Sequence, residues 1–253
     1  RNFRVDQNPG RGGAYKWYYL YALERVGVIL ARREFGNNDW YRAGADYLAG
    51  PNAPNDPGQF YQKCFRLLFL GKGNAPLVIH KAQHRVQLRG ALDGWNRNIL
   101  DIKFLLMFAE QQMDRFLDWQ IIRLDAPLEE LLKAPVLYVS GAGTMRWTEQ
   151  EKKRFKDYVA AGGFVLVEAA NGSEAWDRSF RNFLATHFPE DNLVTLDRNH
   201  PIYSTQFQLR PAERRPLKAI MGPCWISILY VPSGISCRWD IADFDHSDFR
   251  LGM

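Results

Sequence analysis

The segment GGFVLVEAANG, residues 162–172, joins an apolar strand to a corner that holds a carboxylate, Glu168, and an amide, Asn171. Open α/β sheets bind ligands at the carboxyl ends of their strands, so the corner predicts ligand contacts through Glu168, Asn171 and Gly172. The alternative is an ordinary strand end, in which Asn171 and Gly172 form a turn and Ser173 caps the next helix. A lone carboxylate cannot supply the acid and base of glycoside hydrolysis.

A second side chain with possible chemistry follows a predicted strand closer to the C-terminus. His200 lies in NHPIY, directly after the strand-like LVTL. If its imidazole reached the same sheet edge as Glu168, the pair could act as a general base or bind a metal. A histidine before proline is also a common turn residue, and both interpretations stay open. Glu168 and His200 are therefore the candidate catalytic residues.

The expected nucleophiles are missing from these corners. Ser140 and Gly141, in VSGAG, end another apolar strand and are candidate ligand contacts, but the G-x-S-x-G pattern of a serine hydrolase is absent. A polar residue that ends a buried strand is the favoured interpretation of Ser140. A glutaminase needs a cysteine at a strand end with a histidine beside it, and no cysteine is close to either corner.

The other histidines predict neither a metal nor a cofactor. His187, before Phe188 and Pro189, is expected to close its helix. His246 lies among acidic residues whose spacing fits no standard cation loop, so a solvated acidic turn is favoured over a metal site. These acidic residues are Asp243, Asp245 and Asp248.

The chain has three cysteines and no CxxC motif. Cys64 lies in an apolar helical stretch, where a thiol behaves as a small hydrophobic group. Cys224 and Cys237 flank a predicted hairpin over residues 224–240. A disulfide between them is possible, although free thiols are favoured.

From residue 95 onward, strand and helix patterns alternate. The predicted helices cover 95–116, 127–133, 148–163 and 173–188, and the predicted strands are 119–124, 134–143, 164–169 and 193–196. Thr148 and Glu151 form a capping-box sequence, and Gly162 and Gly163 stop that helix. Short connections between such elements predict a mostly parallel sheet that is covered on both faces.

Residues 1–85 differ in pattern and in charge. They hold 13 Lys and Arg against 6 Asp and Glu, a balance of +7, whereas residues 86–253 hold 20 against 22, a balance of −2. Three helices are expected here, over 15–30, 39–50 and 60–73. The first is apolar on nearly every face and is thus expected to be buried between neighbours. The two domains are predicted to meet near residue 85.

The basic half has no Lys/Arg run and no nucleic-acid motif, so nucleic acid is not expected as a partner. No apolar run approaches the roughly 18 residues that a membrane span needs. The chain begins at Arg1 and ends in the helix-like FRLGM. It is therefore expected to be a fragment, truncated at both ends, whose second domain stops within its last helix.

The helical half resembles the closing repeats of α/α-toroid proteins of the prenyltransferase/squalene-cyclase class. The resemblance rests on KWYYLYALERVGVILARREFGNNDWYRAGADYL and CFRLLFLGKGNAPL, about 70 residues. GQF (58–60) replaces the G-x-W of that class, and its acidic protonation motif is absent. The resemblance implies an all-α remnant that serves packing or recognition.

Residues 86–253 resemble the bacterial domain-of-unknown-function family 4159. Three separated motifs match in order: APVLYVSGAGTMRWTEQEKKRFKDYVAAGGFVLVEAANG, FRNFLATHFPEDNLVTLDRNHPIY and ISILYVPSGISCRWD. The resemblance implies an α/β fold, doubly wound and mostly parallel, of the flavodoxin-like and class I glutamine amidotransferase-like type. It also suggests the bacterial envelope or periplasm. Two positions depart from the family pattern, Ala169 after Glu168 and Gly234 in place of an Asp.

Together these observations predict a non-catalytic module that recognises a small molecule, a glycan or a protein. Trp147, Trp176 and Trp239 could line its cleft and stack on a sugar or peptide, and core packing is the favoured alternative for each. The competing hypothesis is a hydrolase or transferase that works through Glu168 and His200.

Overall fold

The computed structural model describes residues 3–32, 34–51, 53, 59–71, 75–222 and 225–253. The chain forms two compact units, Arg1–Pro76 and Leu77–Met253. The boundary lies earlier than the predicted residue 85, because the strand Leu77–Gln83 belongs to the central sheet of the second unit.

The first unit contains the three predicted helices and a short hairpin. These elements are α1 (Lys16–Ile29), β1 (Glu34–Phe35), β2 (Asn38–Asp39), α2 (Trp40–Ala49) and α3 (Phe60–Gly71). Its core is formed by Leu20, Trp40, Leu48 and Phe69. The expectation that α1 is buried on nearly all sides is wrong for this chain, since Tyr18 and Ile29 on that helix are exposed.

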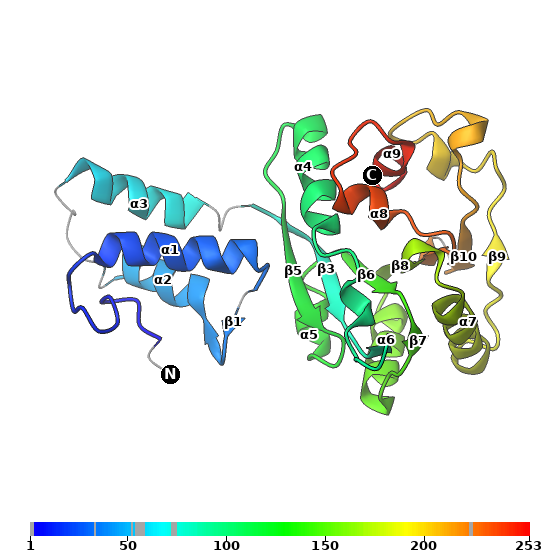
Figure 1. The fold of residues 1–253 in the computed structure, drawn as a ribbon, viewed down its shortest axis with the longest axis horizontal. Coiled ribbons are helices and arrows are strands. Elements are labelled where there is room, and N and C mark those ends of the chain that lie inside the picture. The colour runs from blue at the N-terminus through cyan, green and yellow to red at the C-terminus, as the bar shows by residue number, and fades with distance from the viewer. Residues whose placement is uncertain (1–2, 33, 52, 54–58, 72–74, 223–224) are drawn as a thin grey trace. The chain divides into compact units, whose positions relative to one another are not determined.

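A seven-stranded, mostly parallel sheet is the centre of the second unit (Figure 1). Its strand order is β5-β3-β6-β8-β11-β10-β9, and β10 runs in the direction opposite to the other strands. The strands are β3 (Leu77–Gln83), β5 (Asp118–Arg123), β6 (Val136–Gly141), β8 (Phe164–Ala169), β9 (Val194–Thr195), β10 (Lys218–Met221) and β11 (Ile226–Val231). A second small sheet pairs β4 (Val86–Gln87) with β7 (Thr144–Met145).

Helices cover both faces of the large sheet, as the strand–helix alternation predicted. One face packs on α4 (Asp101–Met113), α8 (Ser236–Asp240) and α9 (Ser247–Leu251). The opposite face packs on α5 (Leu128–Leu131), α6 (Glu149–Ala160) and α7 (Glu174–His187). Four 3-10 turns are described in this unit: η2 (Gly94–Asn96), η3 (Ala170–Gly172), η4 (Pro201–Tyr203) and η5 (Pro211–Glu213).

Helix ends follow the local sequence signals closely. Thr148 Oγ1 accepts a hydrogen bond from Glu151 N at 3.2 Å, and Glu151 Oε2 accepts one from Thr148 N at 2.7 Å, which completes the predicted capping box. At the other end, Gly162 has a φ of +88°, and the Gly163 N–H donates to Tyr158 O at 3.0 Å. This is the Schellman arrangement in which glycine avoids the penalty of a left-handed backbone.

The predicted hairpin over residues 224–240 is only half correct. Its first strand is β11, but its second half forms α8. A contact between distant segments explains the difference, because the buried carboxylate of Glu168 on β8 accepts hydrogen bonds from the first N–H groups of α8.

Candidate functional site

Four polar side chains lie on one face of the sheet at the carboxyl ends of its central strands. The register pairs Lys81 with Tyr138 and Ser140 with Glu168, and alternate residues of a strand share a face. All four side chains are buried, each with at most 2% of its residue surface exposed. They lie under α4 and α8 and form a continuous polar network in an otherwise apolar layer.

Glu168 receives five hydrogen bonds and is fully buried. Tyr138 Oη donates to Oε1 at 2.9 Å, Ser140 Oγ donates at 3.0 Å, and the Ser236 hydroxyl also donates to Oε1. The N–H groups of Ile235 and Ser236 donate to Oε2 at 2.8 and 3.1 Å. A carboxylate is acceptor-only when ionised and offers about four lone-pair sites, so this set of donors saturates it.

A buried ion pair extends the network under α4. Lys81 Nζ lies 2.6 Å from Asp101 Oδ1 and donates to Asn98 O at 2.6 Å. Burial raises the pKa of Asp101 to about 6, against the lowering effect of Lys81. Tyr138 Oη lies 3.3 Å from Asp101 Oδ2, and burial, with Glu168 and Asp101 close by, raises the pKa of the phenol.

Asn98 links this network to the loop after β8. Its side-chain amide donates to Ser236 Oγ at 2.7 Å and to Asn171 Oδ1 at 3.4 Å. Asn171 has a φ of +54°, a left-handed conformation that asparagine tolerates better than most residues. Because its oxygen faces Asn98, its NH₂ group is left to face the space beyond the corner.

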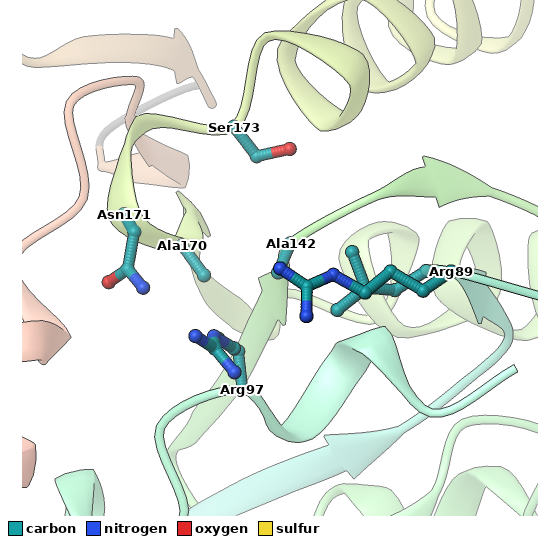
Figure 2. A pocket seen from close by; sticks show the side chains of 7 residues that line it. Arg89, Arg97, Ala142, Ala170, Asn171 and Ser173 are labelled. Atoms are coloured by element: carbon teal, nitrogen blue, oxygen red, sulfur yellow. The ribbon is translucent and has the colours of Figure 1, made fainter. Parts of the chain in front are cut away.

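That space is a pocket of about 270 Å³ (Figure 2). It is lined by loops that follow three neighbouring parallel strands: Leu88, Arg89 and Arg97 after β3, Ala142 after β6, and Ala170, Asn171 and Ser173 after β8. The chain leaves β3 toward β5 on one side and later enters β6 on the other. A site where the strand order reverses in this way is the usual ligand position of an open α/β sheet.

Arg89 reaches the pocket from a tight turn. Leu88 and Ala91 exchange two backbone hydrogen bonds of 3.0 Å, and the two residues between them have positive φ angles, +48° at Arg89 and +88° at Gly90. This is the type I′ geometry of a two-residue hairpin, in which glycine or asparagine normally occupies both positions. A left-handed arginine is sterically unfavourable, and such strain concentrates at ligand-binding positions.

Some of the predicted site residues lie at the pocket, and others have structural roles away from it. Asn171 lines the pocket and Gly172 (φ +70°) forms the turn beside it. Ser140 is not among the described lining residues, and its hydroxyl donates a hydrogen bond to Glu168 instead. Gly141 makes room for packing, because a Cβ there would lie 2.1 Å from the Trp176 ring. Ser173 caps α7 as predicted, since its Oγ accepts from Trp176 N at 3.4 Å.

His200 lies apart from Glu168. It follows β9 at the sheet edge, and β11 and β10 separate that strand from β8. Its Nδ1 accepts from Ile202 N at 3.2 Å, so the side chain caps its own 3-10 turn, η4. The turn interpretation therefore describes His200 in this structure, and no hydrogen bond among the described residues joins it to Glu168.

The predicted solvated turn around His246 is only partly correct, since Asp245 is exposed in a turn but Asp248 is not. Asp248 is fully buried and forms a double ion pair with Arg215, with N–O distances of 2.6 and 2.7 Å. His246 Nδ1 accepts from Asp248 N at 3.2 Å and caps α9. The residues that the structure describes contain no cluster of His, Cys, Asp and Glu that could hold a metal. His187 ends α7, as predicted.

The described cysteines are free thiols, and the three candidate tryptophans are buried. Cys64 and Cys237 are free thiols, in α3 and α8, whereas Cys224 lies outside the described residues. Trp147, Trp176 and Trp239 are at most 5% exposed. Core packing, the favoured alternative, therefore describes these three tryptophans in this structure.

Gly234 holds the β11–α8 turn against the β8 corner. A Cβ at this position would lie 2.7 Å from Ala169 O and 2.9 Å from Asn171 N, and φ is +67°. We expect Gly234→Ala to cost about 3 kcal/mol of unfolding free energy, from backbone strain and displacement of the corner. Urea unfolding measures the loss. Gly162→Ala is the control, because φ is positive there but the nearest neighbouring atom lies 3.9 Å away, and it should cost about 1 kcal/mol. Equal losses would show that the close approach is unimportant.

Residues 84–248 match the protein family described as "Domain of unknown function (DUF4159)". The chain belongs to this family. The matched range contains the pocket and most of the polar network, although Lys81 precedes it. A search of curated proteins finds no match. None of the described helices has the length and apolarity required to cross a bilayer.

Sequence reasoning missed most of the residues that form the site. Lys81, Asp101, Tyr138 and Ser236 belong to the network, and Arg89 and Arg97 belong to the pocket. One available signal was a lysine inside the apolar run LVIHKAQ, which a buried strand tolerates only with a partner. Another was the Arg-Gly pair between two short strand-like segments, which fits a tight hairpin.

Proposed function

We propose that residues 77–253 form a non-catalytic recognition module that binds its ligand in the pocket at the carboxyl edge of the sheet. The observation that carries this proposal is the state of Glu168. The only carboxylate of the β8 corner is fully buried, saturated by five donors and absent from the pocket wall. A general acid or base must reach the substrate within hydrogen-bond distance, and this side chain has no free lone pair to do so.

The pocket wall itself offers binding groups rather than a reaction centre. The seven described residues that line it include no cysteine, histidine or carboxylate. Ser173 is the one hydroxyl, and its oxygen already caps α7. An activated serine needs a base in contact with it, and none is among the lining residues. The hydrolase or transferase alternative required Glu168 and His200 at one pocket, and neither lines this one.

The finer fold assignment is part of the same proposal. Numbered along the chain, the parallel strands β3, β5, β6, β8 and β11 have the order 2-1-3-4-5. This order supports a flavodoxin-like sheet of the glutamine amidotransferase-like type that retains its ligand position without a nucleophilic cysteine. We propose the α/α-toroid origin of the helical unit, and a location in the bacterial envelope, on the sequence resemblances.

The test is to titrate the ¹⁵N-labelled full chain with cell-wall glycans and peptides while recording the Asn171 side-chain amide signals. We expect saturable shifts for a bound ligand and no products from a parallel screen of esters, amides and glycosides. Turnover that is lost in His200→Ala, with the variant still folded by circular dichroism, would instead establish an enzyme.

A further inference from the structure

We propose that the pocket recognises a phosphoryl group, the dianionic end of a phosphomonoester, between the guanidinium groups of Arg89 and Arg97. The inference rests on the proposed function, because it specifies which ligand chemistry the recognition pocket takes. Figure 2 shows the two guanidinium groups extending into the same space from two positions in the loop after β3, beside Asn171 and Ala142.

The described residues that line the pocket carry two positive charges and no carboxylate. Both arginines are exposed, and neither forms an ion pair with any acidic residue that the structure describes. Most other arginines of this unit do pair, for example Arg123 with Asp125, Arg215 with Asp248 and Arg250 with Glu213. Two guanidinium charges over one small pocket repel each other, and a dianion relieves that repulsion.

The other polar groups of the wall present donors. Asn98 occupies the side-chain oxygen of Asn171, so the Asn171 NH₂ group faces the pocket, and Figure 2 shows this nitrogen on the side of Arg97. Ser173 Oγ already accepts from Trp176 N, so its proton is the group left to interact with a ligand. The pocket also adjoins the N-terminus of the 14-residue helix α7, where the helix dipole favours negative charge.

Charge and size decide between the possible oxyanions. A phosphomonoester carries about −1.5 to −2 charges at neutral pH and three acceptor oxygens, whereas a carboxylate carries one charge and two oxygens. Two arginines and two further donors match the phosphoryl group better, because each guanidinium can bind two oxygens in a fork. A volume of about 270 Å³ admits this group together with a small part of the molecule that carries it.

The test is calorimetric titration of the full chain with phenyl phosphate, and with benzoate as the monoanionic analogue. We expect phenyl phosphate to bind at least about tenfold more tightly than benzoate, and more weakly as salt increases. Arg89→Gln and Arg97→Gln should each raise the Kd about tenfold or more, since each removes charge-assisted hydrogen bonds. Arg115→Gln, at an exposed arginine outside the pocket, is the matched control and should leave the Kd unchanged.

Circular dichroism melting establishes that the variants are folded. Equal affinity for benzoate and phenyl phosphate, or unchanged affinity in both pocket variants, would overturn the inference. If a neutral glycan or peptide shifts the Asn171 amide signals and phenyl phosphate does not, the pocket is a recognition site for another ligand class and only the inference fails. If no ligand shifts these signals, the proposed function fails with it.

Discussion

Glu168→Gln is expected to destabilise the second unit by about 3–5 kcal/mol without changing its surface. Glutamine has the shape of glutamate, but one of its two terminal groups is an NH₂ that can only donate. It would face either the hydroxyls of Tyr138, Ser140 and Ser236 or the N–H groups that begin α8. Several buried donors would then lose their acceptor, and the contact between β8 and α8 would weaken.

Urea unfolding at neutral pH measures this effect. Glu149→Gln is the control, because the Glu149 side chain is 86% exposed and its pair with Lys152 lies on the surface of α6. We expect the control to change stability by less than about 1 kcal/mol. A loss below about 1 kcal/mol for Glu168→Gln as well would mean that the five hydrogen bonds neither hold the corner nor keep Glu168 in place.

Lys81→Met is expected to cost about 3–5 kcal/mol at pH 8, because it leaves the Asp101 carboxylate buried without its cation. The cost should be smaller at pH 5, by at least about 1 kcal/mol. The direction of this pH dependence follows from how many protons the folded and unfolded states bind. Burial raises the pKa of Asp101 from 3.8 to about 6 in the folded state, so between about pH 4 and 6 the folded protein binds more protons than the unfolded chain. Stability from this group therefore falls as pH rises through that window.

Removing Lys81 removes an influence that lowers the pKa of Asp101, so the window widens toward higher pH. Urea unfolding at pH 5 and pH 8 tests this dependence. The double variant Lys81→Met/Asp101→Asn is the matched comparison, since it leaves neither charge buried, and it should be more stable at pH 8 than Lys81→Met alone. Equal cost of Lys81→Met at both pH values would contradict a buried pair that depends on ionised Asp101.

Local sequence signals predicted the parts of the fold that depend on neighbouring residues. The capping box at Thr148 and Glu151 and the glycines after α6 form within a few residues of one another. The mostly parallel, helix-covered sheet also followed from alternating apolar patterns, because strands buried on both faces are nearly continuous apolar runs. Family membership was recognisable for the same reason, since its motifs are these strands and corners.

The site was only partly predictable because its residues come from distant segments. Asn171 was identified from the glycine-rich corner, but Arg89 and Arg97 reach the same pocket from the loop after β3, more than seventy residues earlier in the sequence. Glu168 was identified as a carboxylate at a strand end. The hydrogen bonds that saturate the Glu168 carboxylate depend in part on Ser236. The sequence around Ser236 predicts a strand, but in the structure it begins the helix α8, which Glu168 caps.

The central claim is that the carboxyl-edge pocket binds a ligand through Arg89, Arg97 and Asn171, with Glu168 serving only as a structural anchor. The most direct measurement is a crystal structure of the full chain grown with phenyl phosphate. The account predicts phosphoryl density between the two guanidinium groups, within hydrogen-bond distance of the Asn171 amide nitrogen, with Glu168 still buried under α8. A phosphoryl group bound elsewhere, or Glu168 turned out to contact it, would contradict the account.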